Sequence, residues 1–380
     1  MPAASGRVMR TGVNVSYGLA SIAAMRILVV HAWLKGNVGD VLQLSVLVGA
    51  LRALKPEVLD LAGCPAEPAD NTREIVSVVD TYVPEPFEWY WKYSPNVVRS
   101  LLLEPRWKKH RRALFSRYNA IISAPGPFLA EYDARLPSAL SDIALAGEIG
   151  IPFLLSSHSI GPLPQEALAR LGKVAACVAR EKSTHQYLLR RGIQSVLSAD
   201  LAFLYPYEAL RGREPAATPV DPPYRLVFLR CNNLEPGSFR RDQDGLRSGS
   251  IPIAGASGER IVLATSDVRR DGRFLASLSN RLGIPWTACQ TVSKLVHLVD
   301  GSAGVVSDRY HPAICAAVLG KPSQILQNRE PHKMEGLQTL LAEHSLSELQ
   351  GLAQAGLTEI RAALRRAGQA SPRAPSERSA

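Results

Sequence analysis

The sequence predicts an α/β protein with two doubly wound, Rossmann-like domains that face a cleft. Three observations lead to this fold class. The chain has 380 residues, which is more than one small domain needs. From Arg26 onward, short apolar runs alternate with segments of helical pattern. A stretch rich in proline and glycine, residues 205–223, interrupts this alternation once, and the alternation then resumes.

The expected elements follow in order along the chain. Each expected strand is a short apolar run of the kind that forms a buried parallel strand, and each expected helix follows a turn signal. The expected strands are residues 26–31, 120–123, 152–156, 175–179, 226–230, 260–264, 304–307 and 323–327. The expected helices are residues 40–54, 138–149, 164–173, 183–191, 267–282, 292–299 and 309–319.

These elements divide the chain into six parts. The first part is expected to be disordered or to precede the true start, and the last is expected to be a solvated tail rich in Ser, Pro, Ala and Arg. In order, the parts are an N-terminal extension (1–24), an N-terminal domain (25–204), a linker (205–223), a C-terminal domain (224–345), a C-terminal helix (346–367) and the tail (368–380).

Composition excludes several classes of protein. Hydrophobic residues make up 46% of the chain and charged residues 21%, which is typical of a globular protein. The five cysteines form no CxxC pair, so a disulfide framework or a thiolate metal site is not expected, and a reducing cytoplasm is favoured. The net charge of +10 is concentrated at the two ends and forms no basic stripe on a recognisable module, so no nucleic-acid partner is expected.

The loop Gly36-Asn-Val-Gly-Asp40 joins the first expected strand to the first helix. Glycines at positions 36 and 39 let the backbone turn tightly and approach a ligand closely. The N–H groups at the start of a helix favour an anion or a polar oxygen. Asp40 can cap the helix or act chemically, and the two roles are compatible.

A second segment, Val306–Ala313, ends an expected strand and opens a helix in the second domain. Arg309 offers a bidentate fork for phosphate or carboxylate. His311 offers a proton near neutral pH, and Pro312 is common in a first helical turn. A histidine two residues after an arginine at a strand-to-helix turn is not a typical core histidine, so a functional site is predicted here.

From about Met25 to Leu341, the chain resembles the polysaccharide pyruvyl transferase family. The resemblance rests on a set of short motifs whose order and spacing are specific together. They are the GNVGD loop, the Ser159-Ile-Gly-Pro162 turn, Val178-Ala-Arg-Glu-Lys-Ser183, Asp200 within Ser198–Phe203, and Arg309-Tyr-His311 with Pro322 downstream. Two departures, Ala124-Pro-Gly-Pro127 and Ser157-His158-Ser159, fall on segments expected to line the first domain's side of the cleft.

The resemblance implies a fold similar to GT-B glycosyltransferases. It implies phosphoenolpyruvate as the donor, a sugar in a polysaccharide or on a lipid carrier as the acceptor, and neither cofactor nor metal. Ketal formation needs cations for the donor's phosphate and carboxylate, and an acid that protonates its methylene carbon. The donor would then contact Arg309, Arg180, Arg230 and Lys333. His311 would be the general acid, and Asp40 would accept the hydroxyl proton.

The acceptor side is expected in the first domain. Gly36, Asn37, Gly39 and His158 are predicted to contact the acceptor, although His158 can equally be a satisfied histidine at a strand end. Asp200 is expected to be structural, tying loops together near the cleft.

Residues 86–118 have the most unusual composition of the chain. Several aromatic residues are followed by a run of lysines and arginines. The segment can be a helical excursion with a solvated basic face, a groove that stacks on acceptor sugars, or a contact with the anionic inner face of a membrane.

Two other functions remain open at this point. A nucleotide-sugar glycosyltransferase would require an acidic residue in the second domain for a ribose diol. A non-catalytic protein that only binds glycans would account for the departures at Ala124 and Pro125, although it would not need Arg180, Arg309 and His311.

Overall fold

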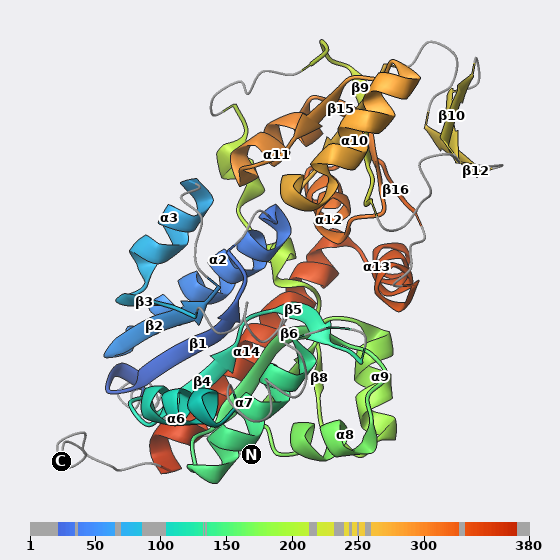
Figure 1. Cartoon of the computed structure of the whole chain (residues 1–380). Coiled ribbons are helices and arrows are strands. Elements are labelled where there is room, and N and C mark those ends of the chain that lie inside the picture. Colours follow the sequence, from blue (N-terminus) through green and yellow to red (C-terminus); the bar gives the residue numbers. More distant parts are fainter. Residues whose placement is uncertain are drawn as a thin grey trace, which may run out of the picture.

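The structure is a computed structural model of the whole chain (Figure 1). The residues that it describes are 22–34, 37–64, 70–85, 104–131, 133, 135–212, 219–231, 239–242, 245–248, 251–254, 260–326 and 331–370. The predicted N-terminal extension therefore lies outside the described residues up to position 21, and the predicted tail from position 371. Ile22 is fully buried, so packing begins before Met25.

The N-terminal lobe is built on an eight-stranded sheet of order β3-β2-β1-β4-β6-β7-β8, in which β5 also pairs with β6. Every pairing in this sheet is parallel. Its strands are β1 (Arg26–Ala32), β2 (Val58–Gly63), β3 (Thr81–Pro84), β4 (Ala120–Ser123), β5 (Gly126–Leu129), β6 (Phe153–Ile160), β7 (Ala176–Ala179) and β8 (Val196–Leu197). The helices of this lobe are α2 (Val38–Arg52), α3 (Asp70–Val78), α6 (Glu104–Phe115), α7 (Leu136–Glu148), α8 (Gln165–Leu171) and α9 (Lys182–Arg190).

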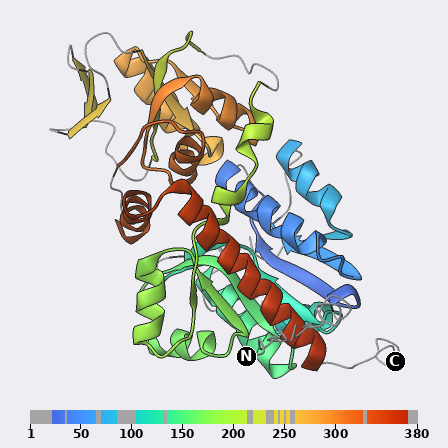
Figure 2. The ribbon, with the colours of Figure 1, turned by 180° about the vertical axis from the view of Figure 1, so that it is seen from behind.

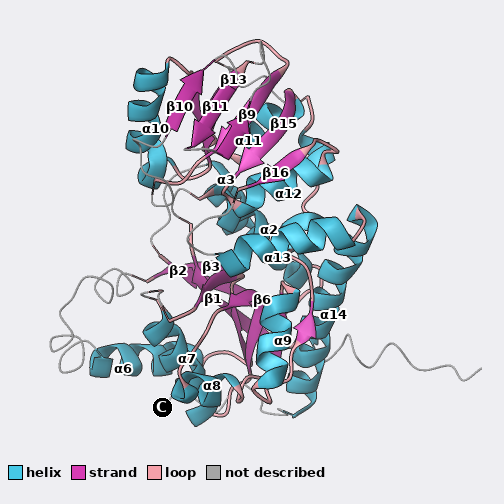
Figure 3. Cartoon of the chain, turned by 90° about the vertical axis from the view of Figure 1, so that its right-hand side faces the viewer, coloured by secondary structure: helices cyan, strands magenta, loops and turns pink. Residues whose placement is uncertain are grey.

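The C-terminal lobe is built on a five-stranded parallel sheet of order β14-β13-β9-β15-β16. Its strands are β9 (Tyr224–Phe228), β13 (Ile261–Thr265), β14 (Trp286–Ala288), β15 (Ser302–Ser307) and β16 (Ser323–Ile325). Its helices are α10 (Val268–Leu282), α11 (Val292–Asp300), α12 (Tyr310–Val318) and α13 (Pro331–Glu343). A separate antiparallel sheet contains β10 (Phe239–Asp242), β11 (Gly245–Ser248) and β12 (Ile251–Ala254). Figure 3 shows the two parallel sheets, each accompanied by helices.

Both parallel sheets have a point at which the strand order reverses. In the first sheet the chain runs outward from β1 to β3 on one side and from β4 to β8 on the other. In the second sheet it runs from β9 to β14 on one side and from β15 to β16 on the other. In open α/β sheets, ligands bind at this reversal, beyond the carboxyl ends of the strands. The fold therefore predicts ligand sites beyond the carboxyl ends of β1 and β4, and beyond those of β9 and β15.

The chain passes between the lobes more than once. Two short 3₁₀ helices, η2 (Leu201–Leu204) and η3 (Tyr207–Leu210), lead from the first lobe toward the second. The long helix α14 (Leu346–Ala370) then returns along the N-terminal lobe, where it packs against β6, β7 and β8 (Figure 2). The helix ends at Ala370, three residues beyond the expected end at 367, and its last buried residues are Ala363, Leu364 and Ala367.

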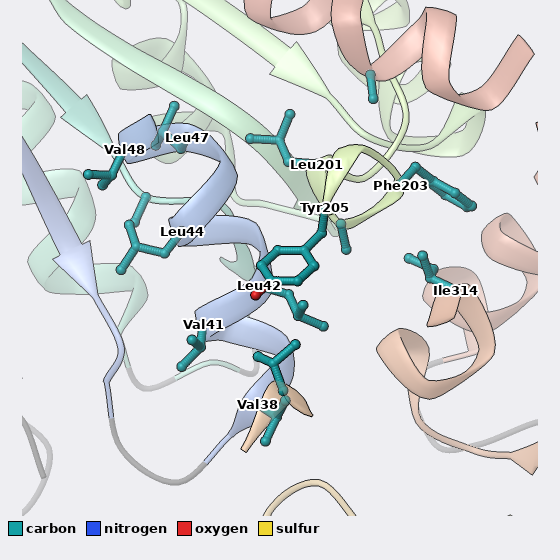
Figure 4. Packing of buried hydrophobic residues seen from close by; sticks show 14 of the residues in the cluster. Val38, Val41, Leu42, Leu44, Leu47, Val48, Leu201, Phe203, Tyr205 and Ile314 are labelled. Atoms are coloured by element: carbon teal, nitrogen blue, oxygen red, sulfur yellow. The ribbon is translucent and has the colours of Figure 1, made fainter. Parts of the chain in front are cut away.

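The lobes share one apolar core. Val38, Leu42 and Leu44 on α2 belong to the same cluster of buried residues as Leu201 and Phe203 of η2 and Ile314 of α12 (Figure 4). The sequence of α2 is apolar on nearly every face, and a helix of this kind must be buried. Most residues of α2 are indeed buried. The contact between α2 and α12 fixes the positions of both helix starts, which carry the two motifs predicted from sequence.

The α/β fold class with parallel sheets is confirmed, and every expected strand has a counterpart. Strands β2, β3, β5, β8 and β14 and the antiparallel sheet were not predicted. One reason is visible in β2, where a buried carboxylate interrupts the apolar run: Asp60 accepts a hydrogen bond of 2.6 Å from the Tyr118 hydroxyl. The partner is distant in sequence, so the run does not read as a strand on its own.

Candidate functional site

The reversal point of the second sheet brings together two of the predicted donor-binding arginines. Arg230 follows β9 and Arg309 follows β15, and these two strands are neighbours. The backbone N–H of Arg230 donates to Asp308 Oδ2 at 2.9 Å, and the N–H of Asp308 donates to the carbonyl of Phe228 at 3.2 Å. These bonds hold the two strand ends together and place both arginines at the edge where a ligand is expected.

Arg309 lies in a largely buried, charged environment. Its guanidinium donates to Asp271, and Asp267 Oδ2 lies 3.9 Å from Nη1. Burial, and after it the charge of Arg230, lower the pKa of Arg309 to about 10. Burial also raises the pKa of Asp267, although Arg309 acts in the opposite direction. Two arginines that repel each other in a site of low polarity would be stabilised by a bound anion.

The start of α12 adds to this preference for an anion. Arg309 is the residue at the N-cap, its side chain makes no capping hydrogen bond, and the first turn contains no acidic residue. The first turn of α12 therefore supplies no carboxylate of its own to the positive end of the helix dipole. Two further predicted cations lie near the first helical residue, Tyr310: the Arg180 guanidinium carbon is 4.6 Å from its ring centroid and Lys333 Nζ is 5.3 Å from it.

Arg180 is fully buried behind the α12 start. Its Nη1 donates to Asp200 Oδ2 at 2.9 Å, and its Nε donates to Ser159 at 2.6 Å and to Glu181 at 3.0 Å. Burial alone would lower its pKa, but Glu181 and then its other anionic neighbours hold that pKa above the usual value. Nη2 is also buried and has no hydrogen-bond partner among the described residues. Direct contact of Arg180 with the donor stays a prediction. In the structure, Arg180 contacts the site through the ring of Tyr310.

The GNVGD loop approaches the second lobe directly. Asn37 forms an isolated antiparallel bridge with Asp267, and the N–H of Val38 donates to the carbonyl of Ser266 at 3.1 Å. Asn37 is the N-cap of α2: its side chain accepts from the N–H of Gly39 at 3.2 Å and donates to Asp40 Oδ2 at 2.8 Å. Gly36 lies outside the described residues. Contact of Asn37, Gly39 and Asp40 with an acceptor stays a prediction.

Gly39 is required by the way that α2 meets α12. A Cβ atom built on Gly39 would lie 1.9 Å from Nδ1 of His311. No side chain can occupy that space, so only glycine lets the two helix starts approach this closely. The two motifs singled out from sequence, which are more than 250 residues apart, therefore form one site.

His311 faces Gln43, a residue that the sequence did not single out. The Gln43 amide nitrogen lies 2.8 Å from His311 Nε2, and the Gln43 oxygen accepts from Arg180 Nη1 at 3.2 Å. Asp200 Oδ2 lies 3.7 Å from the same histidine nitrogen. Burial would raise the pKa of Asp200, but the neighbouring His311 and then the charge of Arg180 hold it below its usual value. Asp200 also caps η2 through the N–H of Ala202, as a structural role would require.

His158 is fully buried and does not reach the surface. Its Nδ1 donates to the carbonyl of Gly126 at 2.9 Å, and its ring packs edge-on against Phe128. Burial lowers the pKa of His158 to about 3, and the bond to Gly126 offsets this only in part. Nε2 is also buried and makes no hydrogen bond to any described residue, so Gly126 satisfies only one of the two ring nitrogens. Contact of His158 with an acceptor stays a prediction.

The buried His158 predicts an acid-sensitive fold. Its pKa of about 3 lies below the ordinary value of 6.5, so the unfolded chain binds the extra proton first. The contribution to stability is complete above the ordinary value and is lost as the pH falls from there toward 3. We expect His158→Gln to remove about 2 kcal/mol of the difference in unfolding free energy between about pH 7 and about pH 5. Denaturant titrations of both proteins at the two pH values measure this difference, and parallel pH dependences would contradict the assignment.

A second buried polar cluster lies at the reversal point of the first sheet, and sequence reasoning missed it. His31 near the end of β1 has a φ of 61°, Nδ1 lies 2.9 Å from the Ser123 hydroxyl, and Nε2 lies 3.0 Å from Asp142 Oδ2. Arg111 donates to Asp142 at 2.6 Å and also to Glu85. A positive φ in a residue other than glycine persists only where the surroundings impose it. The cluster thus fixes the carboxyl end of β1, from which the chain leaves for the GNVGD loop.

The aromatic and basic segment is described only from position 104, as part of α6. This helix buries Trp107, Leu114 and Phe115 and turns Arg106 and Lys109 to solvent. The described part therefore matches the solvated basic face. The aromatic residues from 87 to 93 lie outside the described residues.

Neither a metal site nor a membrane span is evident in the part of the chain that the structure describes. No cluster of three or more His, Cys, Asp or Glu side chains there could hold a metal ion. No described helix is both long and apolar enough to cross a bilayer.

Comparison with solved structures supports the fold. The chain is similar to the UDP-N-acetylglucosamine 2-epimerase from Rickettsia bellii, with a TM-score of 0.55 and 11% identity over 91% of this chain and 98% of that one. It is also similar to the epimerase from Methanocaldococcus jannaschii, with a TM-score of 0.54 and 11% identity over 89% and 99% of the two chains. A putative epimerase from Listeria monocytogenes gives a TM-score of 0.55 and 9% identity over 92% and 98%. At these identities the likeness shows the fold alone, which is GT-B-like.

Sequence comparison identifies the family. No curated protein matched the chain. A family model described as polysaccharide pyruvyl transferase matches residues 37–328, a span that includes Asn37, Gly39, Arg180, Arg309 and His311. The match covers most of the 380 residues. The chain belongs to the polysaccharide pyruvyl transferase family.

Proposed function

We propose that the protein transfers the pyruvyl group of phosphoenolpyruvate to two hydroxyls of a sugar, forming a cyclic ketal and releasing phosphate. The observation that carries the proposal is the convergence at the α12 start. Arg309 and Arg230 lie at the reversal point of the sheet, the helix start is not capped by an acid, and His311 follows in the first turn. This arrangement offers cations for a phosphate and a carboxylate, with a proton donor beside them.

The reaction assigns a role to each group. His311 gives a proton to the methylene carbon of the donor, and the electron pair of the double bond forms the new C–H bond. One acceptor hydroxyl adds to the resulting cationic carbon and loses its proton to a base, for which Asp40 is the candidate. The C–O bond to phosphate then breaks, and the second hydroxyl closes the ring with loss of its own proton. Arg309, Arg230 and Lys333 stabilise the negative charge of the phosphate and the carboxylate.

A nucleotide-sugar glycosyltransferase is less well supported by the same region. Such an enzyme would need a carboxylate in the second lobe for the ribose diol. Asp271 is fully buried and accepts from Arg309, from the Thr265 hydroxyl at 3.1 Å and from the N–H of Cys231 at 3.2 Å. Asp308 accepts from the N–H of Arg230. These two carboxylates therefore serve the protein's own cations and backbone. A third, Asp267, caps α10 by accepting from the N–H of Arg270 at 3.3 Å.

The acceptor is proposed to be a sugar of a polysaccharide or of a lipid-linked oligosaccharide, bound from the N-terminal lobe. A cytoplasmic protein at the inner face of the membrane would meet a lipid-linked acceptor. The exposed basic residues of α6, such as Arg106 and Lys109, support this placement because anionic lipids attract such a surface.

A transfer assay tests the proposal. The protein is incubated with phosphoenolpyruvate or with UDP-N-acetylglucosamine, and with a glycan pool supplied either free or on lipid in anionic vesicles. We expect phosphate release that depends on the glycan, and a product heavier by one pyruvate less one water. Glycosyl transfer from the nucleotide sugar would favour the alternative enzyme, and binding of glycan without any transfer would favour the non-catalytic protein.

Arg309 is expected to determine donor affinity. Arg309→Ala should weaken phosphoenolpyruvate binding by about 1.5–3 kcal/mol, because a charge-assisted bidentate contact is lost. Arg309→Lys should recover only part of this, since an ammonium keeps the charge but not the fork. Calorimetric titration measures the effect, and Arg273→Ala on the exposed face of α10 controls for net charge. Equal donor affinity in all the proteins would rule out this role.

A further inference from the structure

Gln43 is a polar residue in the middle of an apolar helix. It is fully buried in α2, between Arg180 of the same lobe and His311 of the other lobe. Its amide oxygen accepts from Arg180 Nη1 at 3.2 Å, and its amide nitrogen lies 2.8 Å from His311 Nε2. The amide thus bridges two predicted functional residues from different lobes. Packing of the core alone would not require a polar side chain at this position.

The chemistry of the three groups determines how the amide is oriented. A guanidinium has only donors, so Gln43 must turn its oxygen toward Arg180 and its NH₂ toward His311. Nε2 of His311 is then an acceptor, and the neutral ring carries its proton on Nδ1. This orientation of the amide and this tautomer of His311 are inferred from which groups can donate and which can accept.

Nδ1 is the ring nitrogen that faces the GNVGD loop. It lies beside Gly39 at the start of α2, and within the described ranges it has no hydrogen-bond partner. Nε2 in contrast faces the protein, toward Gln43 and, at 3.7 Å, Asp200. A proton delivered to the donor would therefore leave from Nδ1.

We propose that Gln43 is a positioning residue that controls the protonation of His311. In the orientation observed, its NH₂ group keeps Nε2 unprotonated. When the amide turns over, its oxygen accepts an Nε2–H, and the ring can then carry the second proton that a general acid needs. The acid gives the Nδ1 proton to the donor and keeps the Nε2 proton, which the turned amide stabilises.

The amide oxygen cannot accept from Arg180 and from His311 at the same time. Turned toward His311, the oxygen leaves Arg180, which retains Asp200, Glu181 and Ser159 as acceptors. Arg180 thereby acts on His311 through Gln43 without touching it. The charged and titratable groups around His311 also include Asp40 from α2, Asp200 ahead of η2, Lys333 from α13, and Asp308, Arg309 and Tyr310 of its own segment.

Three variants separate this role from simple packing. Gln43→Glu offers two acceptor oxygens and no donor, so it should hold a proton on Nε2. Gln43→Leu keeps the volume approximately but orients neither neighbour. Gln350→Leu removes an amide of α14 that donates to the carbonyl of Phe203 outside the site, and serves as the control.

The first readout is the ¹⁵N spectrum of the His311 ring, assigned by its loss in His311→Gln, on the full chain above neutral pH and without substrate. We expect the wild type and the Gln350→Leu control to carry the proton on Nδ1, and Gln43→Glu to carry it on Nε2. A wild-type ring protonated on Nε2 would overturn the proposal, as would identical His311 spectra in wild type and Gln43→Leu. The Leu comparison decides the question even if the Glu variant fails to fold.

The second readout is kinetic, and this part rests on the proposed function. Gln43→Leu should lower kcat on the order of 10–100-fold, while KM for phosphoenolpyruvate stays within about threefold. Gln43→Glu should move the alkaline limb of the pH–rate profile upward by about one unit or more, since an opposite charge favours the protonated ring. A wild type that does not turn over phosphoenolpyruvate would refute the proposed function and leave the spectroscopic result standing.

Discussion

Replacing His311 by glutamine is expected to lower turnover by about 10²–10⁴-fold, the usual share of general acid catalysis, with a smaller change in donor affinity. An amide can donate a hydrogen bond to the donor phosphate, but it cannot give up a proton at neutral pH. The position of His311 in the first turn of α12, two residues after Arg309, motivates the expectation. Steady-state kinetics with phosphoenolpyruvate give the two effects separately.

The pH dependence of the same two proteins distinguishes acid catalysis from binding. If His311 is the acid, wild-type activity declines as the pH rises, and this decline disappears in His311→Gln. If His311 only binds the donor phosphate, the variant keeps much of its turnover and the same pH profile. His185→Gln serves as the control, because His185 lies on α9 with its Nδ1 2.9 Å from the Ser195 hydroxyl, outside the site.

Adding a single methyl group at Gly39 is expected to have an effect nearly as large. The new Cβ would lie 1.9 Å from His311 Nδ1, so α2 and α12 must separate or the ring must turn away. A displacement of about 1 Å in a catalytic group can cost on the order of 10²-fold in rate. Overpacking of this kind also costs about 1–3 kcal/mol of stability. Kinetics and denaturant unfolding of Gly39→Ala measure the two losses.

Gly49 on the same helix provides a matched control. A Cβ at Gly49 would meet nothing within 4 Å, and the residue is exposed. Gly49→Ala should keep wild-type activity and gain up to about 1 kcal/mol of stability from helix propensity. If Gly39→Ala had the activity and stability of Gly49→Ala, the close contact described between α2 and His311 would be contradicted.

Local sequence patterns identified the residues of the site that lie in strand-to-helix turns, but they did not identify the buried residue that connects them. Gly39 and His311 could be predicted because each stands in a strand-to-helix turn whose chemistry is visible within a few residues. Gln43 could not, since one glutamine in the apolar run Val41–Val48 reads as part of a buried helix. Its meaning depends on Arg180 and His311, which lie 137 and 268 residues away. The one local signal that could have drawn attention to it is a long polar side chain in the apolar middle of α2.

The polar cluster around His31 shows the same limit. Its partners Ser123 and Asp142 lie 92 and 111 residues further along the chain. They meet because β1 and β4 are neighbours at the reversal of the strand order, which no local pattern reveals. His158 shows the limit in another way, since its burial and its bond to Gly126, 32 residues away, are not visible in the local sequence around the family turn.

Transfer of an isotopic label tests the central claim most directly. Phosphoenolpyruvate labelled with ¹³C at the carbon that bears the phosphate is incubated with the protein and a glycan acceptor, and the glycan fraction is examined by NMR. The account predicts that the label appears there as a ketal carbon bonded to two oxygens of one sugar, in amounts equal to the phosphate released, and that His311→Gln suppresses both signals together. Label that stays in phosphoenolpyruvate or appears only as free pyruvate, while the same glycan accepts a sugar from a nucleotide donor, would contradict it.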